Sequence, residues 1–445
     1  MYFIQSTKQQ HRADIMGSVN RTHAAVTAGD DITIVGAGII GVACALSLAR
    51  KGKKVTVIDR QLPGYGASWG NAGHMATEQV FPIADASLLK KIPGMLTDPM
   101  GPLRLDWRHL PRATPWFTRL LFNLRASPYA QSVTALRVLN ESSLRAWRAL
   151  LSSIGAQDLL KDHGSFLIHE HASTRRDLMA VHARMAAQGV TVDLWEGAAI
   201  RQQLPALSSR IQGGLCFPET GHVVNPFTVT EALVRAARHT GVEFQTQEIV
   251  GGKLTSSGVA LRTHDAQTLE ASRVLIACGA HSAALTKALT GVNVPLDTER
   301  GYHLMLPREA DRLPSAVTSL ERRFIMTPMQ DGLRLAGTVE FAGLKRPPNM
   351  QRAWQLHKLT EGLFETPLDT TNATPWMGFR PSLPDSLPII DQVHNGRVLL
   401  AFGHHHLGLT QAAITAEMVA HLASTRQPSL ASALPEMTPY RLTRF

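Results

Sequence analysis

The stretch that most constrains the fold of this chain is residues 31–59, DITIVGAGIIGVACALSLARKGKKVTVID. It opens with Ile32–Val35, a short apolar and β-branched run that is typical of a buried strand. A helix-forming run, Ile39–Arg50, follows, and a second apolar run, Val55–Ile58, closes with Asp59. Strand, helix and strand in this order predict a βαβ unit, the building block of a parallel α/β sheet.

Between the first strand and the helix, three glycines follow the G-x-G-x-x-G spacing. Gly36 permits the tight turn, Gly38 lets the backbone approach a pyrophosphate, and Gly41 allows close packing of helix on strand. The helix N-terminus offers unpaired N–H groups and the positive end of its dipole to the phosphates. Asp59 can accept hydrogen bonds from a ribose. These parts predict a dinucleotide site in a Rossmann-type domain, without distinguishing FAD from NAD.

Length and composition set the broad class. A chain of 445 residues exceeds one ordinary core, so we expect two domains, and 44% hydrophobic residues with 34 glycines suit a soluble α/β enzyme. No apolar run reaches the roughly 18 residues that span a bilayer. The three cysteines show no metal or redox spacing, which indicates a reducing, cytoplasmic compartment.

The formal net charge is +10, but the basic residues are scattered and form no aromatic-interleaved stripe. Nucleic acid is therefore not expected as a partner, and an anionic substrate or an acidic membrane surface explains the charge at least as well. Residues 1–28 are polar, lack a period and lack the apolar core of a secretory signal. We expect a disordered tail there, and translation from Met16 is an open alternative.

Two segments before residue 136 stand out. Residues 64–74, GYGASWGNAGH, are rich in small residues, so they form either a flexible surface loop or a second loop that passes close to a ligand. Residues 88–135 read as an excursion in which Thr114-Pro115 predicts a helix start. Seven basic residues against two acids accompany an apolar face there (Trp116, Phe117, Leu120, Leu121, Leu124). Such a segment can lie on an anionic membrane, or its apolar face can pack on the core or cover the active site.

The remaining chain predicts two kinds of sheet. Helices are expected over 136–186, from Asn225-Pro226 to His239, over 350–365 and up to Ala423. Strands are expected at Ser165–His169, Leu215–Phe217, Glu243–Thr246, Val259–Thr263, Arg273–Ala277 and Val398–Phe402. A tight glycine turn after the strand at 273–277 indicates a sheet assembled from distant segments. Tyr302–Leu306, Arg323–Thr327 and Leu333–Ala336 predict an antiparallel sheet in a second domain.

Six motifs in fixed order carry a resemblance to a known family. They are VGAGIIG at 35–41, GASWGNAG at 66–73, ACGAHS at 277–282, RGYH at 300–303, GFRPSLPDSLPII at 378–390 and GHHHLGLT at 403–410. The chain resembles the FAD-dependent D-amino acid oxidase superfamily over about residues 31–425, most closely the D-amino acid dehydrogenase small-subunit branch. Glycine oxidase and the sarcosine oxidases resemble it more distantly.

The resemblance implies a discontinuous Rossmann-type FAD-binding domain and a substrate domain with an antiparallel sheet plus helices, an α/β fold that is α+β overall. The segments 29–87, 218–298 and 375–445 would form the first domain, and 88–217 with 299–374 the second. FAD would be noncovalent, because Gly70 stands where dimethylglycine dehydrogenase-like relatives carry a flavin-linking histidine. The residues implied to bind FAD are Gly36, Gly38, Ile39, Ile40, Gly41, Asp59, Arg60, Ser68, Asn71, Ala72, Gly73, Ile249, Gly279, Gly403, His406, Leu407, Gly408, Leu409 and Thr410.

Three further residues are implied for the substrate side. Arg380 matches the arginine that clamps the substrate carboxylate, a role that suits a planar guanidinium. Tyr302 can hydrogen-bond the same carboxylate; Arg300 shares its strand face, so His303 is expected to point away. His405 replaces a small residue of the relatives' GHGHxG and can restrict or polarise the pocket. We expect no metal site at 404–406, because adjacent histidines rarely converge on one ion.

The activity implied by the resemblance is oxidation of the Cα–N bond of a D-amino acid by hydride transfer to flavin N5. The imino acid would hydrolyse to a keto acid and ammonia, and the electrons would pass to a quinone or another respiratory acceptor. One alternative is a dehydrogenase of cyclic imino acids such as D-proline or D-hydroxyproline. Another is a flavin-bearing subunit of a hetero-oligomer without activity of its own. Peripheral contact with the inner face of the cytoplasmic membrane and an oligomeric state stay open.

Overall fold

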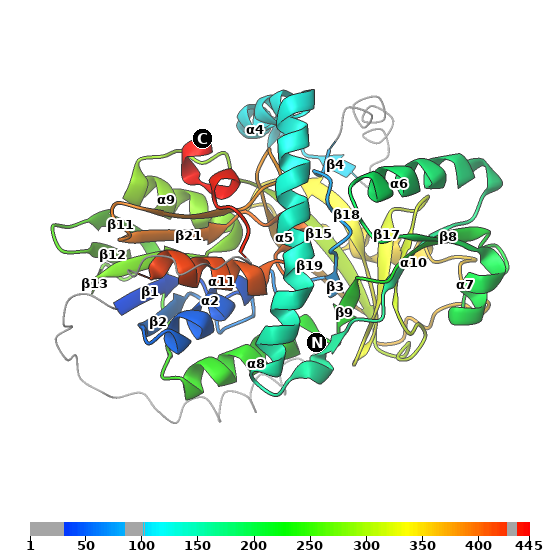
Figure 1. Ribbon diagram of the computed structural model, residues 1–445, viewed down its shortest axis with the longest axis horizontal. Helices are drawn as coiled ribbons and strands as arrows, with labels where there is room; N and C mark the ends of the chain where they lie inside the picture. Colours follow the sequence, from blue (N-terminus) through cyan, green and yellow to red (C-terminus); the bar gives the residue numbers. More distant parts are fainter. Residues whose placement is uncertain (1–30, 85–100, 102, 425–433) are drawn as a thin grey trace.

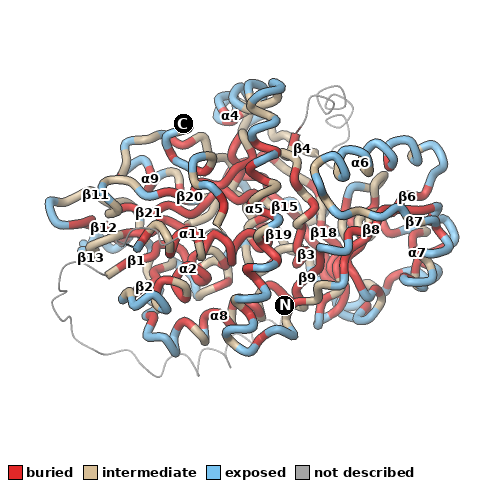
Figure 2. The backbone as a smooth tube through the Cα atoms, in the orientation of Figure 1, coloured by how far each residue is buried: buried red, intermediate tan, exposed pale blue. Residues whose placement is uncertain are grey.

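The computed structural model describes residues 31–84, 101, 103–424 and 434–445. The predicted tail 1–28, the start at Met16 and residues 85–100 of the excursion lie outside the described residues. Two β-sheets lie side by side, and the long helix α5 (Ala126–Ser152) runs between the two halves (Figure 1). Figure 2 shows that the buried backbone follows the strands and α11, whereas α4 and α6 are largely exposed.

The first sheet is a six-stranded sheet of the Rossmann type in which distant segments are neighbours. Its order is β10 (Glu243–Thr246), β2 (Lys54–Asp59), β1 (Asp31–Val35), β14 (Arg273–Ile276), β21 (Val398–Phe402) and β20 (Ile389–Val393). β1 pairs in parallel with β2 and β14, so that Ile34 lies between Val57 and Leu275. β20 is antiparallel at the edge. The predicted assembly of one sheet from separate segments is confirmed.

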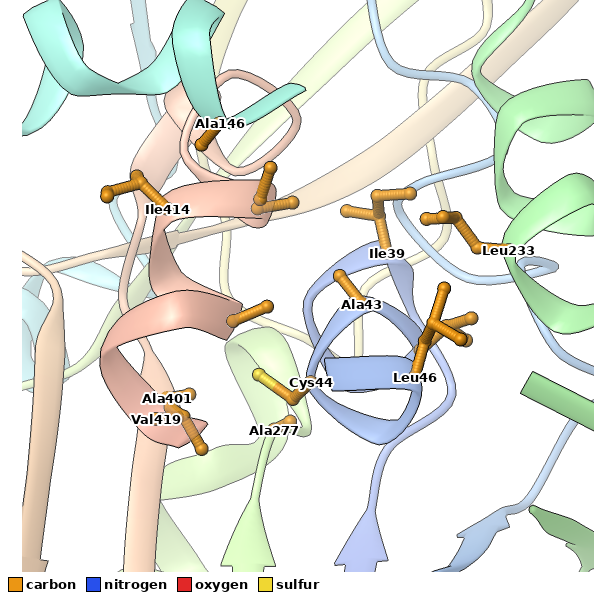
Figure 3. Close-up of a cluster of buried hydrophobic side chains, with 14 of the residues drawn as sticks. Ile39, Ala43, Cys44, Leu46, Ala146, Leu233, Ala277, Ala401, Ile414 and Val419 are labelled. Atoms are coloured by element: carbon orange, nitrogen blue, oxygen red, sulfur yellow. The ribbon is translucent and has the colours of Figure 1, made fainter. Parts of the chain in front are cut away.

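Helix α2 (Ile39–Arg50) has the predicted bounds and is buried between helices because its side chains are small or aliphatic. α11 (Ala412–Ala423) and α8 (Pro226–His239) pack against it. In Figure 3, Ala43 and Cys44 of α2 face the side of Ile414 and Val419, while Ile39 and Leu46 face Leu233. At Gly41 a Cβ atom would lie 1.9 Å from the carbonyl oxygen of Gly36, so the glycine is what allows the helix to lie this close to its strand.

The second sheet is largely antiparallel, as predicted. Its main path is β19 (Thr374–Ser382), β15 (Asp297–Leu306), β18 (Gly332–Phe341), β17 (Phe324–Met329), β16 (Ala316–Ser319), β6 (Ser165–His169), β8 (Gly213–Phe217) and β7 (Asp193–Glu196), with β4 (Leu103–Leu105) beside β18. β6 and β8 come from the segment 88–217 that was predicted to join residues 299–374 in the substrate domain, and they pair in this sheet. Helix α10 (Gln351–Lys358), shorter than the predicted 350–365, covers one face.

Smaller elements complete the described chain. Two three-stranded sheets are formed by β11 (Ile249–Leu254), β12 (Val259–Thr263) and β13 (Thr268–Ala271), and by β3 (His74–Met75), β9 (Gly221–Val223) and β5 (Leu160–Lys161). The predicted strand at 259–263 thus lies in a hairpin sheet rather than in the six-stranded one. The remaining helices are α6 (Arg175–Ala187), α7 (Gly197–Gln203) and α9 (Ser282–Thr290).

Two elements differ from the predicted division into domain segments. β19, predicted within 375–445 of the FAD-binding domain, is hydrogen-bonded to β15 of the second sheet along its whole length. α5, predicted in the substrate domain, packs on the core of the first sheet, where the indole Nε1 of Trp147 donates to the carbonyl oxygens of Leu409 (2.9 Å) and Thr410 (3.0 Å). Both elements bridge the two halves, and a division by sequence cannot detect such bridges.

The predicted helix start at Thr114-Pro115 is wrong. Helix α4 spans Leu110–Asn123, with Pro111 in its first turn and Pro115 inside it. The helix is preceded by a turn at residues 106–109, in which the N–H of His109 donates to the carbonyl of Asp106 at 2.8 Å. Among the described residues, no helix combines the length and the apolar character that crossing a bilayer requires.

Candidate active site

A cavity of about 990 Å³ lies between the two sheets, at the upper end of the range of about 300–1,000 Å³ for small-molecule sites. The first sheet contributes Asp59 and the glycine turn after β1, and the second contributes Gly301 of β15 and the run 376–381 of β19. The loops at 65–72 and 404–409 complete the walls. The cavity therefore meets the carboxyl ends of β1 and β2, where open α/β sheets bind ligands.

The glycine turn has the geometry that its sequence predicts. Gly36 has φ +114°, and a Cβ atom there would lie 2.3 Å from the carbonyl oxygen of Ala277. Its N–H donates to the carbonyl of Ile58 at 2.8 Å, which ties β1 to β2. The Asp59 carboxylate accepts from the backbone N–H groups of Ala37 (2.7 Å) and Gln61 (2.9 Å). Asp59 is thus fixed at the lip of the cavity with acceptor capacity left for a ribose.

The small-residue loop at 64–74 lines the cavity through Ser68, Asn71 and Ala72. The N–H of Ile39, in the first turn of α2, donates to Ser68 Oγ at 2.9 Å. The second sheet holds the other end of the loop, since Arg334 Nη1 donates to the carbonyl of Asn71 at 2.5 Å. Of the two predicted interpretations, the loop that passes close to a ligand fits this position.

The C-terminal loop is held by neutral, buried histidines. His404 Nε2 lies 3.0 Å from Thr415 Oγ1, and His406 Nε2 lies 2.5 Å from Gln79 Oε1. Burial lowers the pKa of both His404 and His406 to about 3, so neither carries charge at neutral pH. Gly403 has φ +89°, a conformation that favours glycine.

Most residues implied to bind FAD line this one cavity: Gly36, Gly38, Ile39, Ile40, Asp59, Arg60, Ser68, Asn71, Ala72, Ile249, Gly279, His406, Gly408 and Leu409. Five do not line it. Gly41 packs on Gly36, Gly73 lies against Met329, and Gly403 lies against Leu383. Leu407 belongs to the core of the first sheet, and Thr410 Oγ1 accepts from the N–H of Ala76 at 3.1 Å. These five support the walls from behind.

Arg380 lies in the same cavity, on β19. Its guanidinium covers the backbone of Gly301, where a Cβ atom would lie 2.3 Å from Nη2, and Nη1 donates to the carbonyl of Thr338 at 3.3 Å. Burial lowers the pKa of Arg380 and the carboxylate of Glu299 partly offsets this, but a guanidinium stays charged throughout the physiological range. The arrangement leaves a cation that can pair with a planar carboxylate inside the cavity.

Tyr302 does not face Arg380. β19 and β15 pair so that Arg380 lies opposite Glu299, and side chains alternate along a strand, which puts Arg380 on the face of Glu299, Gly301 and His303. Tyr302 lies on the other face. Its hydroxyl donates to Glu340 Oε2 at 2.6 Å and accepts from the N–H of Asn349 at 3.2 Å. Tyr302 nevertheless lines the same cavity as Arg380, so the expectation that the two residues bind one carboxylate stays a prediction.

The predicted alternation itself holds, because Arg300 shares the face of Tyr302. Arg300 Nη1 lies 3.6 Å from Glu340 Oε2. The Arg300 guanidinium also donates to the carbonyls of Gly343, Arg346 and Pro347. His303 was expected to point away from Tyr302, and it does lie on the opposite face, that of Arg380, without being one of the residues that line the described cavity. There its Nδ1 donates to the carbonyl of Gly70 at 2.8 Å and its ring stacks on Trp376 with centroids 5.0 Å apart. A strand alone does not reveal which face looks toward the ligand.

His405 lines the cavity but has no free ring nitrogen. Its Nε2 accepts from the N–H of Leu383 at 3.0 Å, so the proton is assigned to Nδ1, which donates to Ser382 Oγ at 3.1 Å. The backbone of His405 has φ +51°, which is unusual for a residue with a side chain and explains why a small residue is common in relatives. With both nitrogens engaged, His405 shapes the cavity instead of acting as an acid or base.

Glu299 was not found by sequence reasoning, and no motif signalled it. It is 4% exposed and accepts from Ser382 Oγ at 2.5 Å, with His405 Nδ1 3.6 Å away. Burial alone would raise its pKa, but the polar groups of His405 and Ser382 and the charge of Arg380 lower the pKa of Glu299 to about 2. Glu299 is therefore an ionised carboxylate directly behind the cavity wall. Trp376, Met377, Phe379 and Lys345, also missed, line the same region.

Comparison with known proteins gives one consistent family. The family described as FAD dependent oxidoreductase (DAO) matches residues 31–422. The chain is 33% identical over 425 residues to a D-amino-acid oxidase of Bradyrhizobium diazoefficiens, covering 94% of this chain and 99% of the relative. It is 31% identical over 416 residues to a D-amino acid dehydrogenase of Methylobacterium radiotolerans, covering 90% and 97%.

The fold is shared with solved structures. A glycine oxidase from Geobacillus kaustophilus superposes with a TM-score of 0.72 at 21% identity, covering 93% of this chain and 98% of the other. The glycine turn without room for side chains, the helix N-terminus behind it, Asp59 and the size of the cavity all fit FAD. The chain therefore belongs to the DAO family of FAD-dependent oxidoreductases, and FAD is its cofactor.

Proposed function

We propose that this protein oxidises the Cα–N bond of a D-amino acid to an imino acid, which water then converts to a keto acid and ammonia. The observation that carries the proposal is the guanidinium of Arg380 inside the cavity that the FAD-binding loops line. Two relatives that match over nearly their whole length are named as a D-amino-acid oxidase and a D-amino acid dehydrogenase, which supports the same reaction class.

The residues of the chain contribute binding and orientation. Arg380 would hold the substrate carboxylate through two parallel N–H···O bonds, which would fix the position of the Cα–H bond inside the cavity. Trp376 and Phe379, from opposite faces of β19, also line the cavity. Bound FAD supplies the acceptor for two electrons and the hydrogen. Because both nitrogens of His405 are engaged, we infer that the bound zwitterion loses its amine proton to water and not to this residue, and that the neutral amine then reacts.

The test is anaerobic bleaching of the flavin absorbance by a panel of D- and L-amino acids that includes D-proline and D-hydroxyproline. We expect D-amino acids to bleach the flavin and their L-enantiomers not to do so. Arg380→Ala should raise KM on the order of 100-fold, since removing one partner of a buried charge pair costs about 2–5 kcal/mol. Arg262→Ala, on the remote hairpin sheet, is the matched control.

The panel also separates the alternatives. Bleaching by cyclic imino acids alone would give the narrower D-proline-type activity. Flavin that no amino acid reduces would contradict the proposal and favour a flavin-bearing subunit that needs partners, which a pull-down would then identify. Bleached enzyme mixed with oxygen and with a soluble quinone, in separate experiments, reports the acceptor, and we propose that the quinone reoxidises it faster.

We further propose that helix α4 contacts an anionic membrane surface. Trp116 is buried and Phe117 packs on Phe341 with ring centroids 5.3 Å apart, so one face of α4 lies on the second sheet. Trp107, Leu121 and Phe122 are nevertheless 63%, 54% and 56% exposed. The segment carries an excess of arginine (Arg104, Arg108, Arg112, Arg119, Arg125). Exposed aromatic and aliphatic side chains beside arginines are the composition that binds anionic lipid.

A further inference from the structure

The buried carboxylate behind the cavity has no part in the reaction proposed above. Glu299 and Arg380 are cross-strand partners on one face of the second sheet, so the two charges are fixed near each other. The groups within hydrogen-bonding distance of Glu299 and beside it are Ser382 Oγ and the ring of His405, whose Nε2 accepts from the N–H of Leu383 and therefore carries no proton in this geometry. Neither brings a formal charge. The carboxylate and the guanidinium therefore balance each other before any substrate enters.

This balance restricts what the substrate end of the cavity can bind. An amino acid zwitterion brings one negative and one positive charge and leaves the buried sum at zero. A carboxylic acid anion without an amine leaves it at −1. Burying a net charge away from water costs free energy. At an effective dielectric constant of about 20, the interaction energy of two neighbouring unit charges amounts to kilocalories per mole.

The other ionisable groups that line the cavity do not restore the balance. Asp59 and Arg60 lie at the end of β2, and Glu248 and His281 lie 4.0 Å and 2.9 Å from the Arg60 guanidinium, so these four groups belong to the nucleotide side. His404 and His406 are neutral for the reasons given above. Lys345 is exposed, so water screens its charge.

We propose that Glu299 is a specificity-determining residue: its fixed charge beside Arg380 makes the site select amino acids over carboxylates of the same shape that lack the amine. The proposal rests on the proposed function, because it takes Arg380 as the carboxylate ligand. Glu299 acts through charge at a distance and touches neither substrate nor cofactor. A purely structural role would instead disturb both kinds of ligand equally.

The experiment compares two ligands in the FAD-loaded protein. One is the best D-amino acid of the panel, measured by its KM; the other is the carboxylate that lacks its amine, propanoate for D-alanine, measured by its perturbation of the flavin absorbance spectrum. In the unmodified protein we expect the carboxylate to bind at least roughly tenfold more weakly than the amino acid, from the charge argument. Equal affinities would overturn the proposal, whatever any variant does.

Variants then separate charge from shape. Glu299→Gln should tighten propanoate binding roughly tenfold without tightening the amino acid, because the site then carries +1. Glu299→Asp keeps the charge and should keep the preference for the amino acid. Parallel weakening of both ligands in Glu299→Gln would overturn the proposal and indicate a structural role. If no amino acid reduces the flavin of the unmodified protein, the proposed function itself fails, and that outcome is read before any variant is made.

Discussion

The contact beneath Arg380 involves a residue without a side chain. Gly301 lies directly under the guanidinium of Arg380, and an added Cβ atom would lie 2.3 Å from Nη2 and 2.4 Å from Cζ. No real Cβ approaches a neighbour this closely. The proposed carboxylate site is therefore built from two strands: β19 supplies the cation, and β15 supplies the flat backbone beneath it.

Gly301→Ala should displace the guanidinium and weaken substrate binding. We expect KM to rise at least about tenfold, with a smaller change in kcat, because the lost interaction is uniform binding by a charged pair. FAD content, measured by absorbance, should stay unchanged. Gly251→Ala on β11 is the control, since its Cβ would meet nothing closer than 3.5 Å. A KM unchanged from the unmodified protein would show that Arg380 is not the carboxylate ligand.

At the scale of single residues, the sequence predicts those features that depend only on nearby residues in the chain. Gly36 could be assigned from its spacing, because the turn it makes is local. The alternation of Tyr302 and His303 could be predicted, but not which of them shares a face with Arg380, because that depends on the pairing with β19, more than 70 residues away in the chain. Glu299 had no local signal at all, since its partners Ser382 and His405 come from two other segments.

At the scale of elements, helix α4 shows how a pattern can support two interpretations at once. Its apolar residues were expected either to pack on the core or to face a membrane, and the helix divides them between the protein interior and the surface: Trp116 is 3% exposed and Phe122 56%. The indole Nε1 of Trp116 also donates to the carbonyl of Ser382 at 3.0 Å. Helix α4 is therefore hydrogen-bonded directly to β19, the strand that carries Arg380.

Replacing the exposed apolar residues of α4 should abolish lipid binding. We expect the protein to sediment with vesicles of anionic phosphatidylglycerol at low salt and much less with neutral phosphatidylcholine, since the arginines supply the attraction. The double variant Leu121→Ser with Phe122→Ser should lower the partition coefficient at least about tenfold, as each side chain contributes on the order of 1.5–3 kcal/mol when fully buried.

The control for this measurement is Met179→Ser on α6, a residue that is 40% exposed on the other half of the molecule. It should leave sedimentation unchanged. Raising the salt concentration should release the unmodified protein, because screening shortens the reach of the arginines. Equal sedimentation of the α4 double variant and the unmodified protein would contradict the proposed contact.

At the scale of the whole molecule, the site exists only where the two sheets meet. The first sheet presents the glycine turn, the second presents β15 and β19, and α5 packs on the first sheet beside both. Sequence patterns identified both sheets and most walls of the cavity, because each wall is a local motif. They misassigned α5 and β19, because the partner of an amphipathic helix or an edge strand is chosen by three-dimensional packing.

Folding of this molecule buries several histidines that must stay neutral, and this predicts its response to acid. Burial lowers the pKa of His222 to about 4, that of His404 and His406 to about 3, and that of His303 well below its usual value. In the unfolded chain histidine titrates near 6.5. Below about pH 6.5 the unfolded state therefore takes up protons that the folded state refuses, and stability falls as the pH drops toward the folded pKa values.

One histidine opposes this trend. The pKa of His74 is raised: burial opposes protonation, but Glu78, 3.0 Å away, and the carbonyl of Gly221 outweigh it. His74 therefore adds stability below about pH 6.5 that is lost as the pH rises through its folded pKa. The lowered carboxyl pKa of Glu299 acts only in stronger acid, from its ordinary value of 4.5 down to about 2. Burial and the charge of Arg60 also lower the pKa of His281. With five histidines whose pKa is lowered against one whose pKa is raised, we expect the free energy of unfolding to be lower at pH 5 than at pH 7.5.

The measurement is urea unfolding followed by tryptophan fluorescence at pH 7.5, 6.5 and 5, with a fixed excess of FAD and a refolding check at each pH. The midpoint should fall from pH 7.5 to pH 5. His222→Gln removes one neutral histidine outside the cavity, so the difference between its midpoints at the two pH values should be smaller than in the unmodified protein. A midpoint that rises toward pH 5 would mean that His74 and its partner Glu78 dominate the acid response instead of the buried neutral histidines.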